Sequence, residues 1–424
     1  MELKIIAFII TTSLVNNVTV FLLFDLVQIR ELFTIFVPKI VMITREIESL
    51  LKEYSQQFRS LLVVGPRQTG KSTVVKKVFS NKPYVSLENI DERTLAENDP
   101  RAFLNRFPKG AILDEVQRAP LLFNYLQEII DNSNDDGLFI LTGSNNLLLQ
   151  SNISQSLAGR VGIIDLLPLT VKEVEKFGKT NLSLNEQVLK GSYPEIYDKN
   201  RKPTLWYPAY IRTYVERDVR LIKNIENTLL FTKFLKLCAG RIGQQVNISA
   251  LSNECGIDVK TVNSWLSVLE SSFVIKLLQP YYKSFNKRVV KTPKLYFYDT
   301  GLACSLLNIK NTNELSWSHF KGSLVENFIL MELLKQMKNK GTREDVYYWR
   351  DNKGVEIDIL IDYGNKLLPI EIKSAQTFNK DFLTNMNKFN SYANINNGWL
   401  IYDGKLEFET EQGILVKNWK NTFI

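Results

Sequence analysis

The chain has 424 residues, of which 45% are hydrophobic and 23% charged, which is typical of globular proteins and leaves room for two or three domains. Its one histidine, His319, excludes histidine-based metal sites and serine triads, and its three cysteines lack the spacing of a metal site or a disulfide framework. The net charge of +8 favours an anionic partner such as nucleic acid, and the cysteine usage favours a reducing compartment, so we expect a cytoplasmic protein.

The first 41 residues are unusually apolar. Ile5–Phe24 carries no charge, and about 20 apolar residues are enough to span a bilayer. Threonine, serine and asparagine side chains interrupt the stretch, and Met42 begins an ordinary soluble start with a charged amphipathic helix behind it. We expect residues 1–41 to precede the true start, with a membrane anchor as the alternative. A membrane partner is not expected unless these residues are real.

The clearest motif follows a predicted buried strand at Leu61–Val64 and precedes a predicted helix at Thr73–Phe79. Between them, Gly65–Ser72 matches GxxxxGK[ST], the phosphate-binding loop of nucleotide hydrolases, and the alternative is an ordinary glycine-containing turn. Backbone N–H groups and the helix N-terminus attract phosphate. We expect Lys71 to reach the β- and γ-phosphates of ATP and the Ser72 hydroxyl to bind Mg²⁺. The residues expected to bind ATP in this loop are Gly65, Pro66, Arg67, Gln68, Thr69, Gly70, Lys71, Ser72 and Thr73.

A second short apolar strand, Ala111–Glu115, ends in two carboxylates. We expect Asp114 to complete the Mg²⁺ shell and Glu115 to orient and deprotonate the attacking water, because this hydrolysis depends on positioning and charge neutralisation. The alternative is a pair of solvated acids at a strand end.

A third strand, Leu138–Ser144, brings further polar residues to a strand tip. Ser144 and Asn145 are candidates for sensing the γ-phosphate, with a turn-forming role as the alternative. Arg160 is a candidate arginine finger, and its alternative is a structural or surface arginine. Such a finger acts in trans only in a homo-oligomer, which the sequence does not show.

The middle of the chain changes character. Alternating strands and helices over residues 42–165 predict a parallel sheet, and residues 166–240 read as a helical lid or linker. Residues 241–300 have a winged-helix pattern, in which Ser249 caps a short helix, Gly256 makes the turn and Asp258 caps a second helix. A winged helix of this kind predicts DNA binding. The alternative is a contact with protein, because Lys260 is the only basic residue on the outer face of the second helix.

The C-terminal part, residues 301–424, contains a predicted hairpin around Gly364-Asn365. Counting outward from that turn places Asp358 opposite Glu371, and Glu356 opposite Lys373. Two acids beside a lysine suit Mg²⁺ or Mn²⁺, and Glu326 on a preceding helix is another candidate ligand. We therefore expect a second metal site made by Glu326, Asp358, Glu371 and Lys373, with a salt-bridged hairpin face as the alternative.

Several of these segments together resemble the prokaryotic AAA-type ATPases that carry a C-terminal domain of unknown function. The segments that carry the resemblance are Gly65–Ser72, Leu113–Gln117, Leu141–Ser144, Ser156–Arg160, Gly191–Glu195 and Tyr210–Arg220. The tail is similar to the PD-(D/E)xK nuclease core through Asp358 and Glu371-Ile-Lys373, although Ile357 stands where that pattern has proline.

The resemblance implies an α/β chain with a P-loop parallel-sheet ATPase domain, a helical lid, a winged helix and a restriction-endonuclease-like C-terminal domain. It implies an ATP-dependent hydrolase, and the net charge and the winged-helix pattern lead us to expect that this hydrolase acts with DNA. Two alternatives stay open: an ATP-gated, metal-dependent DNase, and an ATP-switched DNA- or protein-binding module with an inactive tail.

Overall fold

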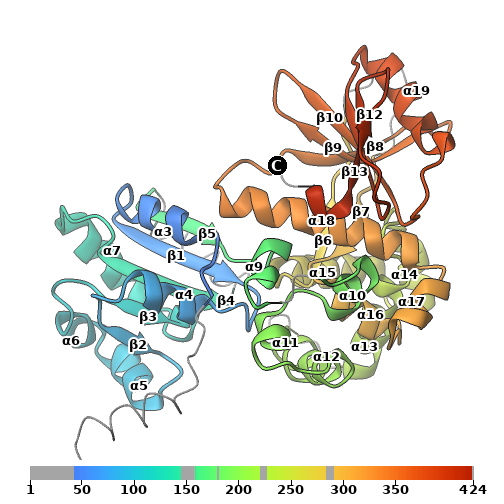
Figure 1. Cartoon of the computed structure of the whole chain (residues 1–424). Helices are drawn as coiled ribbons and strands as arrows, with labels where there is room; N and C mark the ends of the chain where they lie inside the picture. The colour runs from blue at the N-terminus through green and yellow to red at the C-terminus, as the bar shows by residue number, and fades with distance from the viewer. Residues whose placement is uncertain are drawn as a thin grey trace, which may run out of the picture. The chain divides into compact units, whose positions relative to one another are not determined.

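The computed structural model describes residues 43–144, 157, 159–178, 181–219, 227–282 and 291–422, with the backbone alone for 216–219. The chain divides at Ile43, and everything below concerns the unit Ile43–Ile424. The predictions made for residues 1–41 and for Asn145 fall outside the described residues. Figure 1 shows the order of the elements along the chain.

A five-stranded parallel sheet forms the first part, as the alternation of strands and helices predicts. Its strand order is β2-β3-β4-β1-β5. The strands are β1 (Ser60–Gly65), β2 (Tyr84–Ser86), β3 (Ile112–Asp114), β4 (Phe139–Ser144) and β5 (Val161–Asp165). The residues of β1, β3 and β4 are all buried, which is expected of parallel strands covered on both faces.

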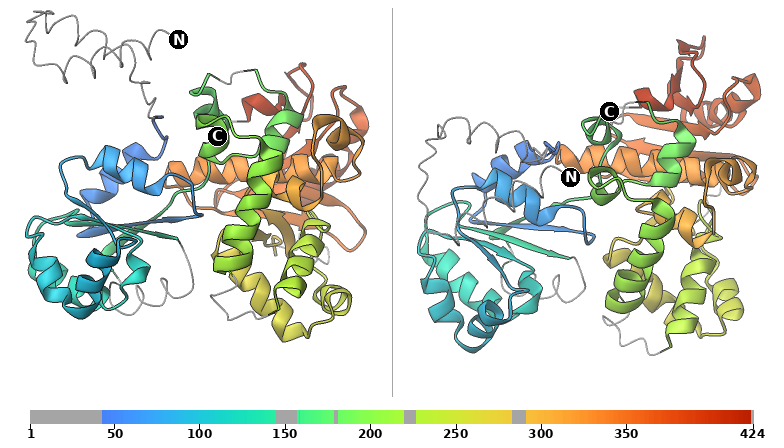
Figure 2. Two further views of the ribbon diagram at one scale, coloured as in Figure 1. Left: turned by 90° about the horizontal axis from the view of Figure 1, so that it is seen from below. Right: turned by 60° about the horizontal axis from the view of Figure 1, so that its bottom comes forward.

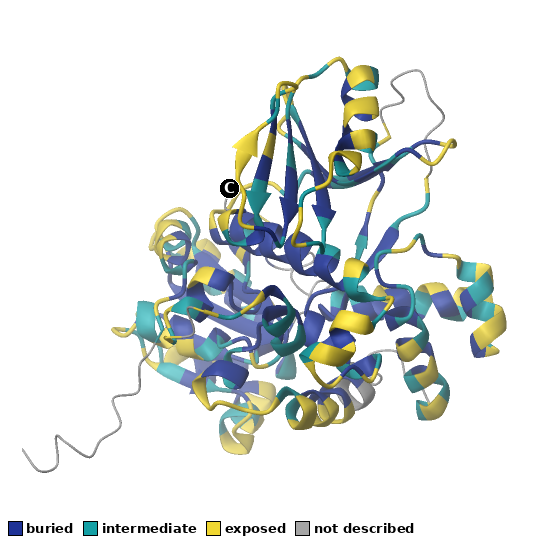
Figure 3. Ribbon diagram, turned by 45° about the vertical axis from the view of Figure 1, so that its right-hand side comes forward, coloured by how far each residue is buried: buried dark blue, intermediate teal, exposed yellow. Residues whose placement is uncertain are grey.

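Helices cover the two faces of this sheet (Figure 2), and helices of the protein have both buried and exposed residues (Figure 3). On one face, α3 (Glu48–Ser55) and α4 (Lys71–Val78) share a core with Leu61 and Val63. On the other face, Leu62 and Val64 belong to the larger core. The helices that contribute to that core are α5 (Ile90–Asn98), α6 (Pro100–Asn105) and α7 (Leu122–Asn132). The alternation of β1 side chains between the two cores explains the continuous apolar run of this strand.

The segment that follows is mostly helical, as expected. It contains α9 (Val171–Glu175), α10 (Leu184–Lys190), α11 (Pro194–Asp198), α12 (Pro203–Tyr210), a π-helix η2 (Ile211–Val219) and α13 (Thr228–Ala239). The rings of Tyr193, Trp206 and Tyr210 pack together, with centroids about 5 Å apart. The π-helix over Ile211–Val219 is a local departure from the α-helical geometry of its neighbours.

Two helices and a strand pair come next: α14 (Ile248–Cys255), α15 (Val259–Ser271), β6 (Ile275–Leu278) and β7 (Lys294–Phe297). The prediction that Ser249 caps α14 is wrong, because the Asn247 side chain accepts from the Ala250 N–H at 2.9 Å and the helix already begins at Ile248. Gly256 adopts a left-handed turn, and Asp258 caps α15, both as expected. The order of elements agrees with the predicted module, whose assignment as a winged helix stays a prediction.

The C-terminal part combines helices with a six-stranded mixed sheet of order β12-β13-β11-β10-β9-β8. The helices are α16 (Thr300–Leu306), α17 (Thr312–Trp317), α18 (Lys321–Asn339) and α19 (Thr384–Ala393). The strands are β8 (Val346–Arg350), β9 (Glu356–Asp362), β10 (Leu367–Lys373), β11 (Gly398–Tyr402), β12 (Phe408–Glu409) and β13 (Ile414–Asn418). The hairpin register is as predicted from Asp362↔Leu367 to Ile359↔Ile370.

Helix α18 packs against α10 and α16 and reaches the end of the first sheet (Figures 1 and 2). Its Glu332 carboxylate accepts from the Val171 N–H at 3.0 Å, and its Lys335 donates to the Leu169 carbonyl at 2.9 Å. Among the residues described, no helix is both long and apolar enough to cross a membrane.

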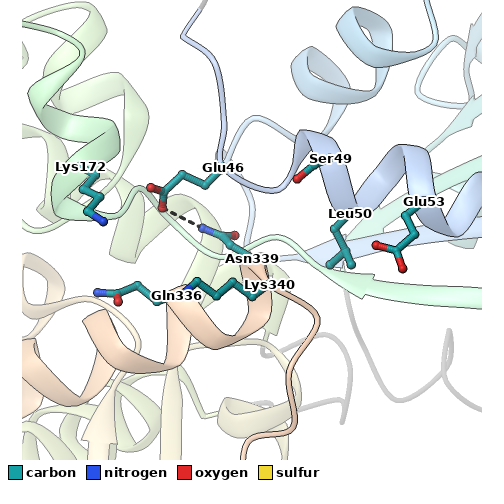
Figure 4. Close-up of a pocket in the computed structure, with 8 residues that line it drawn as sticks. All are labelled: Glu46, Ser49, Leu50, Glu53, Lys172, Gln336, Asn339 and Lys340. Atoms are coloured by element: carbon teal, nitrogen blue, oxygen red, sulfur yellow. Dashed lines mark hydrogen bonds between the residues drawn. The ribbon is translucent and has the colours of Figure 1, made fainter. Parts of the chain in front are cut away.

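A pocket of about 310 Å³ lies where α3, α9 and α18 approach one another (Figure 4). Its lining residues are Glu46, Ser49, Leu50, Glu53, Lys172, Gln336, Asn339 and Lys340. Asn339 donates to the Glu46 carboxylate across it at 3.5 Å. No residue of the predicted phosphate loop lines this pocket.

Candidate functional site

The backbone of the loop between β1 and α4 requires glycine at two positions. At Gly65, φ is +154°, and a Cβ would lie 2.2 Å from the Leu166 carbonyl oxygen. Gly70, directly before α4, is left-handed with φ of +87°. A residue with a side chain is strained in both places, so these glycines allow the tight turn that the motif predicts.

Lys71 lies inside this loop. Its side chain is buried, and Nζ donates to the Gly65 carbonyl at 3.1 Å and to the Pro66 carbonyl at 2.8 Å. Burial lowers the pKa of Lys71 to about 8, although the charges of Glu115 and Asp114 oppose the change. Thr69 also donates to the Pro66 carbonyl, at 3.0 Å, so the loop is held by its own side chains.

Asp114 at the end of β3 meets Ser72 at the start of α4. The Ser72 hydroxyl donates to Asp114 Oδ2 at 2.8 Å. Two further donors fix the same carboxylate: Tyr84 donates to Oδ2 at 2.6 Å, and Thr142 donates to Oδ1. Sequence reasoning missed both residues, although they lie on β2 and β4, the strands that flank β3.

Glu115 follows β3 in a left-handed conformation with φ of 57°, which is uncommon for a residue with a side chain and is often found at functional sites. The Gln117 amide donates to the Glu115 carboxylate and also to Ser144 Oγ, at 3.1 Å. Strand β4 lies between β1 and β3, and Ser144 is paired with Gly65. The structure thus brings Glu115 and Ser144 together through Gln117, whose contribution sequence reasoning missed.

The remaining loop candidates lie around this centre. Arg67 lies over the Tyr214 ring in η2, with its guanidinium carbon 5.7 Å from the centroid. Gln68 and Thr73 are exposed. Arg160 pairs with Asp131 on α7, and one of the contacts joins Nη2 to Oδ2 at 3.1 Å. Its role as an arginine finger stays a prediction.

Arg45, which sequence reasoning did not single out, braces the loop from outside. Its guanidinium donates to the Thr69 carbonyl at 2.8 Å, the Leu167 carbonyl at 2.8 Å and Glu173 Oε1 at 2.9 Å. The exposed fraction of Arg45 is 7% and that of Glu173 is 0%. The partners are 24 to 128 residues away in the chain, so no local pattern could have revealed them.

The C-terminal carboxylates form a separate cluster. Beyond Ile359↔Ile370 the hairpin opens, and Asp358 Oδ2 accepts from the Ile372 N–H at 2.8 Å. Lys373 Nζ lies 3.5 Å from Glu371 Oε1, whereas Glu371 Oε2 is buried and accepts no hydrogen bond from the part of the chain that the structure describes. Burial and the nearby charge of Asp358 raise the pKa of Glu371 well above its usual value.

Glu326 joins this cluster from α18, but a lysine already binds it. Lys294 Nζ, from β7, lies 3.1 Å from Glu326 Oε1 and 2.5 Å from Glu356 Oε1. Tyr296 donates to the same oxygen of Glu326. Burial raises the pKa of Glu326 to about 7, and Lys294 opposes this rise. Among described residues, no set of three or more His, Cys, Asp or Glu side chains is arranged to hold a metal ion, so the predicted metal site stays a prediction.

Comparison with protein families divides the chain into three parts. Residues 57–175 match a family described as an AAA domain. Residues 181–313 and 321–421 match two families, each described as a domain of unknown function (DUF8612 and DUF4143). The AAA match covers the five-stranded sheet with its phosphate loop, Asp114 and Glu115.

Relatives with similar sequences exist in bacteria and archaea. An uncharacterized protein of Mycobacterium tuberculosis is 29% identical over 322 residues, which cover 75% of this chain and 70% of the relative. One from Methanocaldococcus jannaschii is 26% identical over 345 residues, covering 72% and 73%. The Walker-type ATPase of Pyrococcus abyssi is a similar solved structure, with a TM-score of 0.43, 15% identity, and coverage of 62% of this chain and 95% of that one. The family match over residues 57–175 gives this chain an AAA-type, ATPase-like domain.

Proposed function

We propose that the protein binds ATP with Mg²⁺ at the loop of residues 65–73 and hydrolyses it to ADP and phosphate. The observation that carries this proposal is the 2.8 Å hydrogen bond between Ser72 Oγ and Asp114 Oδ2. This contact joins the hydroxyl that follows the loop lysine to the carboxylate at a neighbouring strand tip, and both are ligands that Mg²⁺ prefers.

Ser72 and Asp114 offer the oxygen ligands that Mg²⁺ requires, and the two side chains contact each other. Ser72 and Asp114 would hold Mg²⁺ through oxygen atoms, and Tyr84 and Thr142 hold Asp114 in one orientation. The ion would neutralise charge on the phosphates. Lys71 supplies a second positive charge from within the loop, where the carbonyls of residues 65 and 66 now accept its hydrogen bonds.

Glu115 is the proposed base that orients the attacking water. The Gln117 amide contacts both its carboxylate and Ser144 Oγ, so a change at the Ser144 end of this chain of hydrogen bonds can reach Glu115. We propose Ser144 as the group that senses the γ-phosphate, because it lies at the tip of β4 beside Gly65.

Turnover and nucleotide binding measured on the same variants test this function. Glu115→Gln should bind ATP as the wild type does and hydrolyse it about 10²–10⁴-fold more slowly, the usual contribution of a positioned base. Glu128→Gln, which alters an exposed acid paired with Arg101, is the matched control and should leave both unchanged. Unchanged turnover in Glu115→Gln would overturn the assignment.

DNA is the proposed partner of the helix pair α14–α15. The supporting observations are the Gly256 turn, the following β6–β7 hairpin and the net charge of +8. Binding should then weaken steeply as salt rises, because phosphate contacts release counterions. No binding, or binding that ignores salt, would favour the protein-contact alternative for this module.

A second candidate activity is metal-dependent DNA cleavage by the C-terminal cluster. It is favoured by the hydrogen bond from the Ile372 N–H to the Asp358 carboxylate, next to Glu371. It is also favoured by Glu371 Oε2, a buried atom that accepts no hydrogen bond from any described residue. Plasmid DNA incubated with Mg²⁺ or Mn²⁺ tests it. Cleavage by the wild type that Glu371→Ala abolishes would support the activity, and cleavage that survives this substitution would count against the cluster as its source.

A further inference from the structure

Lys294 is a cation from one module buried among the acids of another. It begins β7 of the hairpin that follows α15, yet its Nζ contacts Glu326 of α18 and Glu356 of β9. Its side chain is only 3% exposed. Lysine is rarely buried unless it is paired with an opposite charge, and here two carboxylates provide that pairing.

The backbone fixes this placement on both sides of β7. Lys294 is paired with Leu278 of β6 on one side and with Gln245 on the other. The next residue, Leu295, donates to the Gln244 carbonyl at 3.0 Å and accepts from the Gly243 N–H at 2.8 Å. Because β7 is paired on both edges, the position of the Lys294 backbone is fixed, and its side chain extends from there to the acid cluster.

The cluster already contains cations that contact its acids. Its four carboxylates, those of Glu326, Glu356, Asp358 and Glu371, are faced by the three cations of Lys294, Arg350 and Lys373. Lys294 Nζ lies 3.1 Å from Glu326 Oε1 and 2.5 Å from Glu356 Oε1, so its charge is paired inside the cluster. A divalent cation placed here would meet a like charge that cannot leave without moving β7.

We propose that Lys294 is a tethered cation that keeps divalent metal out of the C-terminal carboxylate cluster. This inference concerns the same acids as the second candidate activity, but it does not depend on cleavage, because it predicts metal affinity alone. The contact of Lys294 with Glu326 then lowers the affinity of the cluster for metal. By linkage, a bound metal weakens that contact by the same free energy. With Lys294 in contact with Glu326 and Glu356, the cluster binds a divalent metal only weakly.

The test measures Mn²⁺ binding to the full chain without nucleotide, from the loss of the free-ion electron paramagnetic resonance signal. Every protein carries Asp114→Asn, which removes the proposed metal ligand of the nucleotide site. With Lys294 in place we expect no binding below about 1 mM, and Lys294→Met should bind at least about 10-fold more tightly because a competing unit charge is gone. Adding Glu371→Gln to Lys294→Met should remove the gain.

Two control variants separate the loss of the Lys294 charge from a general loosening of the fold as the cause of tighter Mn²⁺ binding. Lys335→Met removes another lysine with 3% side-chain exposure, which contacts the Leu169 carbonyl and Ser192 away from the cluster, and should bind Mn²⁺ as weakly as the parent. Lys294→Arg keeps the charge and should also bind weakly.

The outcomes are distinct. The proposal is overturned if folded Lys294→Met binds no more tightly than the parent, or if its gain survives Glu371→Gln. It is also overturned if the parent itself binds Mn²⁺ at micromolar concentration in a manner that Glu371→Gln abolishes, a result that does not depend on Lys294→Met folding. Lack of DNA cleavage would defeat the second candidate activity and leave this metal-binding prediction standing.

Discussion

Replacing Arg45 by methionine tests whether a buried ion pair holds the phosphate loop. The substitution keeps the aliphatic stem and removes the donors to Glu173, the Thr69 carbonyl and the Leu167 carbonyl. Glu173 is fully buried, and among the described residues its charge is then left with neutral hydrogen-bond donors, the N–H groups of Glu46 and Thr170. Removing one partner of such a pair costs about 3–5 kcal/mol.

The expected result is therefore a loss of about 3–5 kcal/mol in the free energy of unfolding. Urea denaturation followed by far-ultraviolet circular dichroism measures it, with ATP affinity measured in parallel because the Thr69 carbonyl belongs to the loop. Adding Glu173→Gln should recover most of the loss, since the double variant no longer buries an uncompensated charge.

A matched control is Arg59→Met, which breaks a pair with Asp136 in the same domain. That pair is 3.7 Å apart, and its side chains are 37% and 44% exposed, so its loss should cost less than about 1 kcal/mol. If Arg45→Met is no less stable than Arg59→Met, the view that this buried pair braces the loop is wrong.

Two further predictions follow from the geometry. Because Lys71 has a pKa of about 8 and a triphosphate favours its charged form, ATP affinity should fall about 10-fold for each pH unit above 8. Lys71→Arg stays charged and should show no such fall between pH 7 and 9. Equal pH profiles of the two proteins in calorimetric titration would contradict this prediction. Gly191→Ala should lose about 3 kcal/mol of stability in urea denaturation, because φ is +66° and the new Cβ would lie 2.0 Å from the Tyr207 hydroxyl. The control Gly256→Ala, with φ of +75° and open space around the new Cβ, should lose about 1–2 kcal/mol. Equal losses in the two variants would show that the contact with Tyr207 is unimportant.

The parts of the site that could be predicted from sequence are those set by local order. A glycine loop between a strand and a helix positions Lys71 and Ser72 by itself, and the carboxyl ends of parallel strands share one edge of the sheet, which brings Asp114 to Ser72. The hairpin register was predictable for the same reason, because a two-residue turn determines the pairing of the residues that follow.

The parts that escaped prediction depend on contacts between distant segments. Arg45 reaches Glu173 across 128 residues, and Lys294 reaches Glu326 across 32, and neither pair has a spacing that marks it. Lys294 is one of 53 lysine and arginine residues in the sequence, and no local pattern distinguishes it from the others. Its burial among acids depends on how β7 packs against α18, which periodicity does not encode. Asn247 was overlooked as a cap because Ser249, two residues later, is equally suited by residue type.

The dissociation constant of ATP with Mg²⁺, measured by isothermal titration calorimetry on the wild type and on Lys71→Met, tests the central claim most directly. The account predicts binding by the wild type that weakens by at least about 100-fold, or about 2.7 kcal/mol, when the loop loses its cation. Equal affinity in the two proteins would show that the nucleotide does not bind in this loop.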